Sequence, residues 1–167
     1  MANYAVVRTD LMHGTNNPAD LVSVKYQVSS ADTAIENGNV VVVGGLISGE
    51  REVRVGTTPK VTSKRDELVL IATPELIYDE TPRKTYADFR NEAGAVARGY
   101  RLRSGDIFSA TIEAFGGRAA LAAVVVGDIV EAAASTKLNL VETLTSGSTA
   151  IGKVIAKEGN YVVVEVA

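Results

Sequence analysis

The chain has 167 residues, of which 46% are hydrophobic but only 5% aromatic, and its formal net charge is −3. It contains no cysteine, which excludes disulfides, thiol catalysis and thiolate metal sites. The mild acidity argues against general nucleic-acid binding, because such binding usually needs a clustered excess of basic residues.

The chain begins with a short apolar run followed by a turn-rich stretch that includes His13 and Pro18. We expect residues 1–21 to form an arm that is loosely tied to the body unless a partner holds it. An ordinary edge strand followed by a loop is the alternative. The start has no basic segment followed by an apolar one, so no secretory signal is expected. The longest apolar stretch, 119–126, is far shorter than the roughly 20 residues of a membrane span, which predicts a soluble protein with no membrane partner.

Residues 22–167 are predicted to form a β-rich body, which divides into the sub-modules 22–110 and 111–167. Residues 22–28 alternate apolar and polar side chains, as a half-buried strand does. The segments 51–55, 67–71 and 76–78 are predicted as further strands. One short helix is expected over about 83–93, because Pro82 precedes it, Gly94 follows it and its apolar residues keep helical spacing.

From Tyr100 onward, strand-like segments and turns alternate at short intervals. This spacing is typical of an all-β barrel or sandwich, so the predicted fold is mainly β, a small antiparallel barrel or sandwich. The predicted strands of this half are 100–103, 107–112, 124–130, 138–141, 153–157 and 160–166.

Two kinds of turn recur in the sequence. Asn-Gly and Gly-Asn pairs within 35–43 and 156–164 predict β-hairpins, because glycine and asparagine tolerate the positive φ that such turns need. The shared spacing of the two indicates either a duplicated module or, as we favour, two ordinary hairpins. Gly-Asp-Ile occurs at 105–107 and again at 127–129, each time before an extended run. We interpret these triplets as two turns in one β-scaffold, neither of them a site.

Candidate chemistry is sparse. His13 is the only histidine, so neither a Ser-His-Asp triad nor a histidine metal site can be built without it. The acids Glu75, Asp79 and Glu80 lack the alternating spacing of a Ca²⁺ loop. The glycine-rich stretch 43–49 has no following Lys-Ser/Thr, so it predicts a turn or a bulge and no phosphate loop. We therefore expect no catalytic residue, no metal and no cofactor, and a protein that is not an enzyme.

One basic stretch remains, at 98–103. In a strand, Arg101 and Arg103 would share one face while Tyr100 and Leu102 share the other. Arginine is enriched in protein interfaces, so we expect a solvated or partner-binding face here and no nucleic-acid contact.

A set of segments in the middle of the chain resembles auxiliary head proteins of tailed bacteriophages, the capsid decoration or head-fibre type. The resemblance extends over about residues 30–110, in the order Asp32 to Gly38, Gly49 to Val53, Leu70 to Glu75, Tyr78 to Glu80, Phe89 to Gly94, Ala97 to Leu102 and Gly105 to Ser109. It implies a structural virion protein, made in the bacterial cytoplasm, that binds the outer surface of the capsid. The implied partners are the major capsid protein and further copies of the chain, with a trimer as one arrangement.

The capsid-binding residues are expected in the arm and in the basic stretch: Tyr4, Val6, Val7, Arg8, Leu11, Arg101 and Arg103. The arm would order on binding, and many weak contacts over symmetric copies would add up by avidity. The alternative function is a module of a head fibre or tail that binds a receptor or a glycan. It lacks the support of tryptophan, of which the chain has none.

Overall fold

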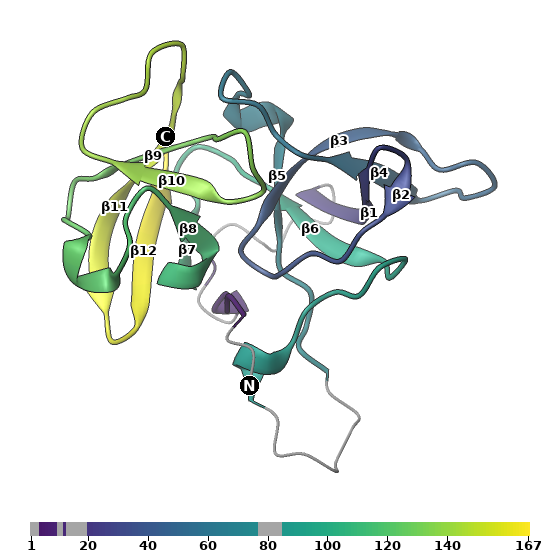
Figure 1. Ribbon diagram of the computed structural model, residues 1–167, viewed down its shortest axis with the longest axis horizontal. Coiled ribbons are helices and arrows are strands. Elements are labelled where there is room, and N and C mark those ends of the chain that lie inside the picture. Colours follow the sequence, from purple (N-terminus) through teal and green to yellow (C-terminus); the bar gives the residue numbers. More distant parts are fainter. Residues whose placement is uncertain (1–3, 10–11, 13–19, 77–84) are drawn as a thin grey trace.

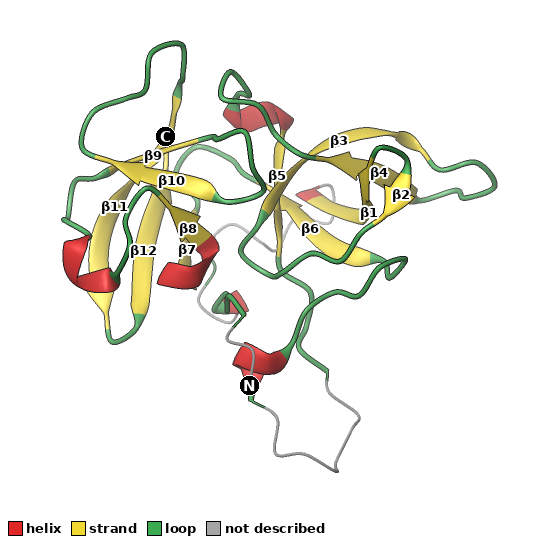
Figure 2. Ribbon diagram, in the orientation of Figure 1, coloured by secondary structure: helices red, strands yellow, loops and turns green. Residues whose placement is uncertain are grey.

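The computed structural model describes residues 4–9, 12, 20–76 and 85–167. It confirms a mainly β fold, in which two six-stranded sheets lie side by side and the helical elements are short 3-10 turns (Figures 1 and 2). No helix among these residues is long and apolar enough to cross a membrane.

The first sheet closes into a barrel. Its order is β2-β1-β4-β3-β5-β6, and β1 also pairs with β6, so five strands surround one interior while β2 extends β1 as a hairpin. Only the β1–β4 pair in this sheet is parallel. The strands are β1 (Leu21–Val28), β2 (Ala31–Asp32), β3 (Val40–Leu46), β4 (Val53–Thr57), β5 (Leu68–Ile71) and β6 (Ala97–Arg101).

Five strands leave little room inside the barrel. Its interior is filled by a small cluster of buried side chains to which Val24, Val41 and Val69 belong. A Cβ at Gly99 on β6 would overlap the Cγ1 atom of Val69 on β5, and a Cβ at Gly56 on β4 would overlap the Cγ1 atom of Val24 on β1. Glycine at these two positions therefore leaves room for the valine side chains that fill the narrow barrel.

The second sheet has the order β7-β12-β11-β9-β10-β8 and curls around its own core. The hairpin predicted within 156–164 is confirmed, because Glu158 pairs with Tyr161 across the turn Gly159-Asn160. The strands are β7 (Ile107–Thr111), β8 (Phe115–Gly116), β9 (Ile129–Glu131), β10 (Leu138–Val141), β11 (Ala150–Glu158) and β12 (Tyr161–Val166).

The two Gly-Asp-Ile turns are the same turn used twice, once on each side of the β11–β12 hairpin. Gly105 N–H donates to the carbonyl of Val166 at 3.0 Å, and Val166 N–H donates back to the carbonyl of Asp106 at 2.9 Å. Gly127 and Asp128 make the same pair of bonds with Val154, at 2.8 and 2.9 Å. Each turn thus fixes the strand that follows it, β7 or β9, against one arm of the hairpin.

In each turn the aspartate side chain also closes a local ring. An Oδ2 atom of Asp106 accepts from Arg103 N–H at 2.8 Å, and Oδ2 of Asp128 accepts from Val125 N–H at 2.9 Å. The glycines have φ of 88° and 101°, a region that favours glycine. The prediction of two turns in one scaffold is confirmed. The two turns are equivalent because each is hydrogen-bonded to one strand of the β11–β12 hairpin.

The two sheets share a core. On β5, Val69 and Ile71 point into the barrel, whereas Leu68 and Leu70 belong to the larger cluster that fills the second sheet. All four side chains have 0% exposure. The division between the two modules lies between Arg101 and Ile107. Residues 107–110, which the sequence assigned to the first sub-module, therefore belong to the second.

The expected loose arm does not apply to residues 4–9. Val7 pairs with Ala110 on the outer edge of β7, and Val6 accepts at its carbonyl from Thr111 N–H at 2.9 Å. Val6 and Val7 are only 8% and 2% exposed. The alternative of an edge strand is closer to the structure, although Val7 forms an isolated bridge and no full strand: the segment pairs with the edge of β7 that β12 leaves open. Removing it would also remove part of the core.

Three other local predictions are wrong. The helix over 83–93 is a single 3-10 turn, η4 (Tyr86–Asp88), among the described residues of that range. Tertiary pairing overrides helix formation there, since Asn91 forms a bridge with Ile35 and the following residues lead into β6. That bridge also prevents the hairpin predicted at 35–43, because Ile35 is paired elsewhere. Leu76, the one described residue of the predicted strand 76–78, lies in no strand.

Candidate functional site

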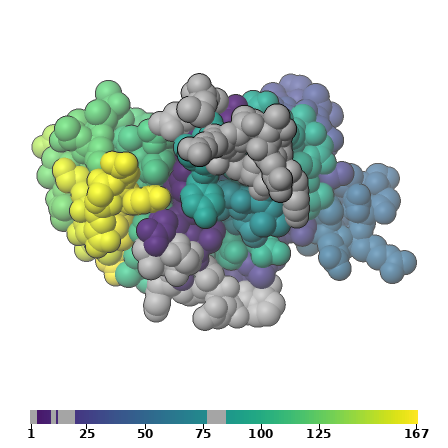
Figure 3. Space-filling view, turned by 90° about the horizontal axis from the view of Figure 1, so that it is seen from below, coloured from purple at the N-terminus to yellow at the C-terminus, as the bar shows by residue number. Residues whose placement is uncertain are grey.

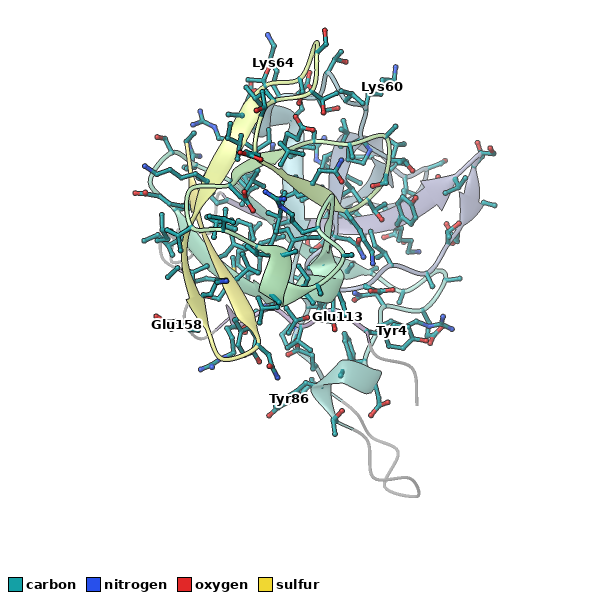
Figure 4. The ribbon with its side chains drawn as sticks, turned by 60° about the vertical axis from the view of Figure 1, so that its left-hand side comes forward. Tyr4, Lys60, Lys64, Tyr86, Glu113 and Glu158 are labelled. Carbon is teal, nitrogen blue, oxygen red and sulfur yellow. The ribbon has the colours of Figure 1, made fainter. Side chains whose placement is uncertain are left out.

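The edge segment and the η4 turn meet at one end of the molecule. Tyr4 N–H donates to the carbonyl of Ala87 at 2.7 Å, which fixes the start of the chain to this turn. The turn itself is closed by Asp88, whose Oδ2 accepts from Thr85 N–H at 2.8 Å and from Thr85 Oγ1 at 3.1 Å. The result is a rigid platform from which Tyr86 projects, 67% exposed. Tyr4 and Tyr86 are both at this end in Figure 4.

Two hollows flank this platform, with volumes of about 440 and 450 Å³. Both are lined by Val6, Tyr86 and Tyr161, so they are adjacent, and we call the two together the tyrosine groove. Tyr161 comes from the β11–β12 hairpin, so the groove is built from three chain segments that are distant in sequence. In Figure 3 the N-terminal residues lie between the C-terminal strands and the rest of the molecule.

The first hollow is the more apolar of the two in its side chains. It adds Tyr4, Ile112 and Leu121 to the shared residues. Ile112 and Leu121 also pack against the larger hydrophobic core, so the floor of the groove is continuous with the interior. An aromatic and aliphatic surface of this kind is where protein interfaces gain most of their binding energy.

Two arginines pack against tyrosines of this region. The Arg8 guanidinium lies 5.6 Å from the centroid of the Tyr161 ring, and Arg90 lies 5.5 Å from that of Tyr4, both at cation–π distance. Arg90 also forms an ion pair with Glu92 at 2.9 Å. This hydrogen bond raises the pKa of Arg90 and lowers the pKa of the Glu92 carboxyl. Arg8 thus packs on Tyr161 and Arg90 on Tyr4.

Four of the expected capsid-binding residues come together in this region. Tyr4 and Arg8 are partly exposed and line the groove, Val6 forms part of its floor, and Val7 is buried in the core. Val7 lines the second hollow but is only 2% exposed, so it mainly supports the groove from beneath. The fifth, Leu11, lies outside the described residues, as do His13, Asp79 and Glu80.

The two arginines of the basic stretch lie elsewhere and differ from each other. Arg103 lies beyond the end of β6, where its Nη2 and Nε atoms bind Oδ1 of the buried Asp20 at 2.6 and 2.7 Å. This hydrogen bond raises the pKa of Arg103. Arg101 lies at the end of the barrel, and no ion pair of it is found among the described residues. The sequence placed both on one partner-binding face; Arg103 remains 60% exposed while it binds Asp20, so its expected partner contact stays a prediction.

Buried carboxylates in the described residues have structural partners. Glu131, 1% exposed, accepts from Thr145 N–H at 2.9 Å and from Thr145 Oγ1 at 2.6 Å, which anchors the loop after β10. Asp128 forms a two-point ion pair with Arg118, at 2.6 and 3.0 Å, which lowers the pKa of Asp128. No group of three His, Asp or Glu side chains in the described part of the chain could hold a metal ion.

Sequence reasoning missed two residues of the groove. Tyr86 falls within the predicted helix 83–93, and Tyr161 falls within the predicted strand 160–166. The available signal was the position of each ring: Tyr161 directly follows the Gly159-Asn160 turn, and Tyr86 precedes the Asp88 that closes its own turn. Neither sequence position reveals that both rings border the same groove.

The predicted bulge in the glycine-rich stretch is confirmed, since the register between β3 and β4 shifts between Val43 and Leu46. The chain matches no protein-family model, and no curated protein is significantly similar to it in sequence.

Proposed function

We propose that this chain is a structural protein of a tailed-bacteriophage virion that binds the outer surface of the capsid through the tyrosine groove. The single observation that carries the proposal is the groove, an exposed aromatic and aliphatic surface on a rigid base. The resemblance over residues 30–110 supplies the virion context. The partner is the major capsid protein, and the chain stabilises or decorates the shell it forms.

The geometry of the groove fits a role in binding without chemistry. Tyr86 is 67% exposed on a turn that is held by the Tyr4–Ala87 and Thr85–Asp88 hydrogen bonds, so little backbone freedom is lost when a partner covers it. Val6 and Ile112 beneath it are continuous with the core. A capsid lattice offers the same surface many times, so a modest affinity at each site is sufficient when copies of the chain act together.

Truncation of the exposed ring tests the proposal. We expect Tyr86→Ala to weaken binding to shells of the major capsid protein by about 30-fold, the loss that follows from removing an aromatic anchor worth roughly 2 kcal/mol. The measurement is cosedimentation of the purified chain with assembled shells. Val28→Ala is the matched control, since Val28 is 45% exposed at the end of β1 and lies outside the groove.

Both variants change an exposed side chain, so their circular dichroism spectra should equal that of the unmodified chain. Equal binding of Tyr86→Ala and the unmodified chain would exclude the groove as the capsid contact. Binding of neither to shells would exclude the capsid as partner.

Glycan or receptor binding is the second candidate, favoured by the three tyrosines Tyr4, Tyr86 and Tyr161 that line one groove. Aromatic faces stack on sugar rings as well as on protein side chains. Electron cryomicroscopy of virions separates the two functions: density for the chain over the capsid lattice supports the first, and density only at a fibre or tail tip supports the second.

A further inference from the structure

A further hollow lies at one end of the barrel, and none of its lining residues belongs to the tyrosine groove. Its volume is about 420 Å³, and three arginines line it: Arg51, Arg54 and Arg101. It lies at the base of the β3–β4 hairpin, which protrudes from the molecule in Figure 1. Leu21 and Leu46, 38% and 51% exposed, lie on the same hollow. We call these five residues the barrel mouth.

Strand register explains why arginines gather there. Arg54 is the partner of Val24 on β1, and Arg101 is the partner of Val69 on β5. Cross-strand partners point to the same face of a sheet, and both valines belong to the barrel interior. Arg54 and Arg101 therefore stand on the inner face of the barrel.

The two arginines also lie at one end of that barrel. β1 and β4 are parallel and begin at this end, whereas β6 is antiparallel to β1 and finishes here with Arg101. Arg51 precedes β4 in the hairpin and is exposed. The guanidinium groups thus come from three different elements and converge on one opening.

None of the three arginines has a carboxylate partner among the described residues. Arg54 Nη1 donates to the carbonyl of Gly44 at 3.2 Å, but the ion pairs found in that part of the chain involve other basic residues. Glu52 lines the hollow without forming such a pair. This contrasts with Arg103, which is bound to Asp20. The barrel mouth therefore gathers three positive charges in a chain whose net charge is negative.

We propose that the barrel mouth binds an extended, acidic segment of a partner protein, with glutamate or aspartate carboxylates on the arginines and apolar side chains on Leu21 and Leu46. A planar guanidinium binds a carboxylate through two parallel hydrogen bonds, and arginine is the preferred residue for such contacts. The apolar residues beside the charges match the side chains that flank an acid in a peptide.

A protein segment fits better than a nucleic acid. Binding of a single strand usually combines a longer basic track with aromatic rings for base stacking, and no aromatic residue is among the described residues that line this hollow. The inference goes beyond the capsid function and stands whether or not the tyrosine groove binds a shell, since the test below contains no capsid.

The test is a titration of the full chain, labelled with ¹⁵N, with two blocked peptides followed by nuclear magnetic resonance. The probe has the sequence Leu-Glu-Val-Glu-Leu, and the matched control replaces both glutamates by glutamine. We expect the acidic peptide to shift the amide signals of Leu21, Arg54 and Arg101, and the neutral peptide to leave them unchanged. A single-stranded oligothymidylate of ten nucleotides is titrated in parallel.

Variants assign the effect to the arginines. Arg101→Gln and Arg51→Gln should each weaken binding of the acidic peptide by about fivefold, the size expected for one partly exposed ion pair. Arg98→Gln is the matched control, because Arg98 is exposed on the same strand as Arg101 and outside the hollow. It should bind as the unmodified chain does. Arg51 is exposed in a hairpin loop, so its variant remains informative even if Arg101→Gln disturbs folding.

The proposal is overturned by any of four results. These are no shift with the acidic peptide, equal shifts with the neutral one, an affinity of the Arg51→Gln variant equal to that of the unmodified chain, and binding of the oligothymidylate in place of the acidic peptide. Selective shifts that Arg51→Gln weakens and Arg98→Gln preserves support it.

Discussion

A substitution of Val7 is the best test of whether residues 4–9 are a loose arm or an integral part of the fold. We predict that Val7→Ala lowers the free energy of unfolding by about 2 kcal/mol. The side chain is 2% exposed and belongs to the core shared by the two sheets. The substitution removes two methyl groups, each worth about 0.8 kcal/mol of transfer free energy, and the cavity left behind adds to this loss.

The space around Val7 has little capacity to collapse. A Cβ built on Gly38 would lie 3.3 Å from Cγ2 of Val7, and the backbone of the segment is fixed to β7 by the bonds of Val6 and Arg8. The melting temperature should fall by about 4–8 °C, because 1 kcal/mol corresponds to about 2–4 °C in a chain of this size.

The assay is thermal unfolding followed by circular dichroism, with reversibility and coincidence of two wavelengths checked first. Val126→Ala is the control, since Val126 is 57% exposed and its truncation should change the melting temperature by less than 1 °C, a value expected for surface positions. A melting temperature of Val7→Ala equal to that of the control would refute the reasoning and restore a detached arm.

Two further predictions concern the ion pair of the second sheet and the interior of the barrel. Arg118 lowers the pKa of Asp128 below its unfolded value, so the ion pair stabilises the fold above about pH 4, and this stabilisation is lost as the pH falls through the folded pKa. The difference in melting temperature between Asp128→Asn and the unmodified chain should therefore shrink on acidification. A constant difference between pH 7 and pH 3 would contradict this. Gly99→Ala should lower the free energy of unfolding, measured in urea, by about 1–3 kcal/mol, because the new Cβ would overlap Val69. Gly45→Ala is the control: it has open space around it, so its free energy of unfolding should change by no more than about 0.5 kcal/mol. Equal urea midpoints for the two variants would show that the barrel adjusts to the added methyl group.

Local patterns were sufficient to predict much of the β-structure. The alternation in 22–28 and the apolar run 67–71 correspond to β1 and β5, and the Gly159-Asn160 turn produces the hairpin that sequence analysis expected. These features depend on neighbours in the sequence, so their physical causes are visible in it. The continuous burial of β5 follows from its position between two cores, for which an unbroken apolar run is the matching pattern.

The features that failed depend on distant partners. The Asn37-Gly38 pair makes no hairpin because Asn37, 0% exposed, donates from Nδ2 to the carbonyl of Thr73 at 2.8 Å and accepts at Oδ1 from Thr73 N–H at 3.0 Å. A hairpin turn does occur nearby, at Ser29-Ser30, where both residues have positive φ. The sequence does not predict this turn, because it has two serines where glycine or asparagine is expected. The pairing of β1 with β2 offsets the cost of the positive φ at the serines.

The candidate surfaces were predictable only in part. Tyr4 and Arg8 were selected from the sequence and line the tyrosine groove, but Tyr86 enters it through a turn that sequence analysis took for a helix. The barrel mouth shows the same limit. Arg101 was singled out, whereas Arg54 joins it only because the register of three strands brings their ends together.

The double burial of β5 has a consequence for fragments of this chain. A cut between Arg101 and Ile107 would leave one piece with the barrel interior and an uncovered outer face of Leu68 and Leu70, and another piece whose core has lost those side chains. Each half would expose an apolar surface shaped for the other. The two halves are therefore expected to be poorly soluble alone and to reassemble by complementation when they are produced together.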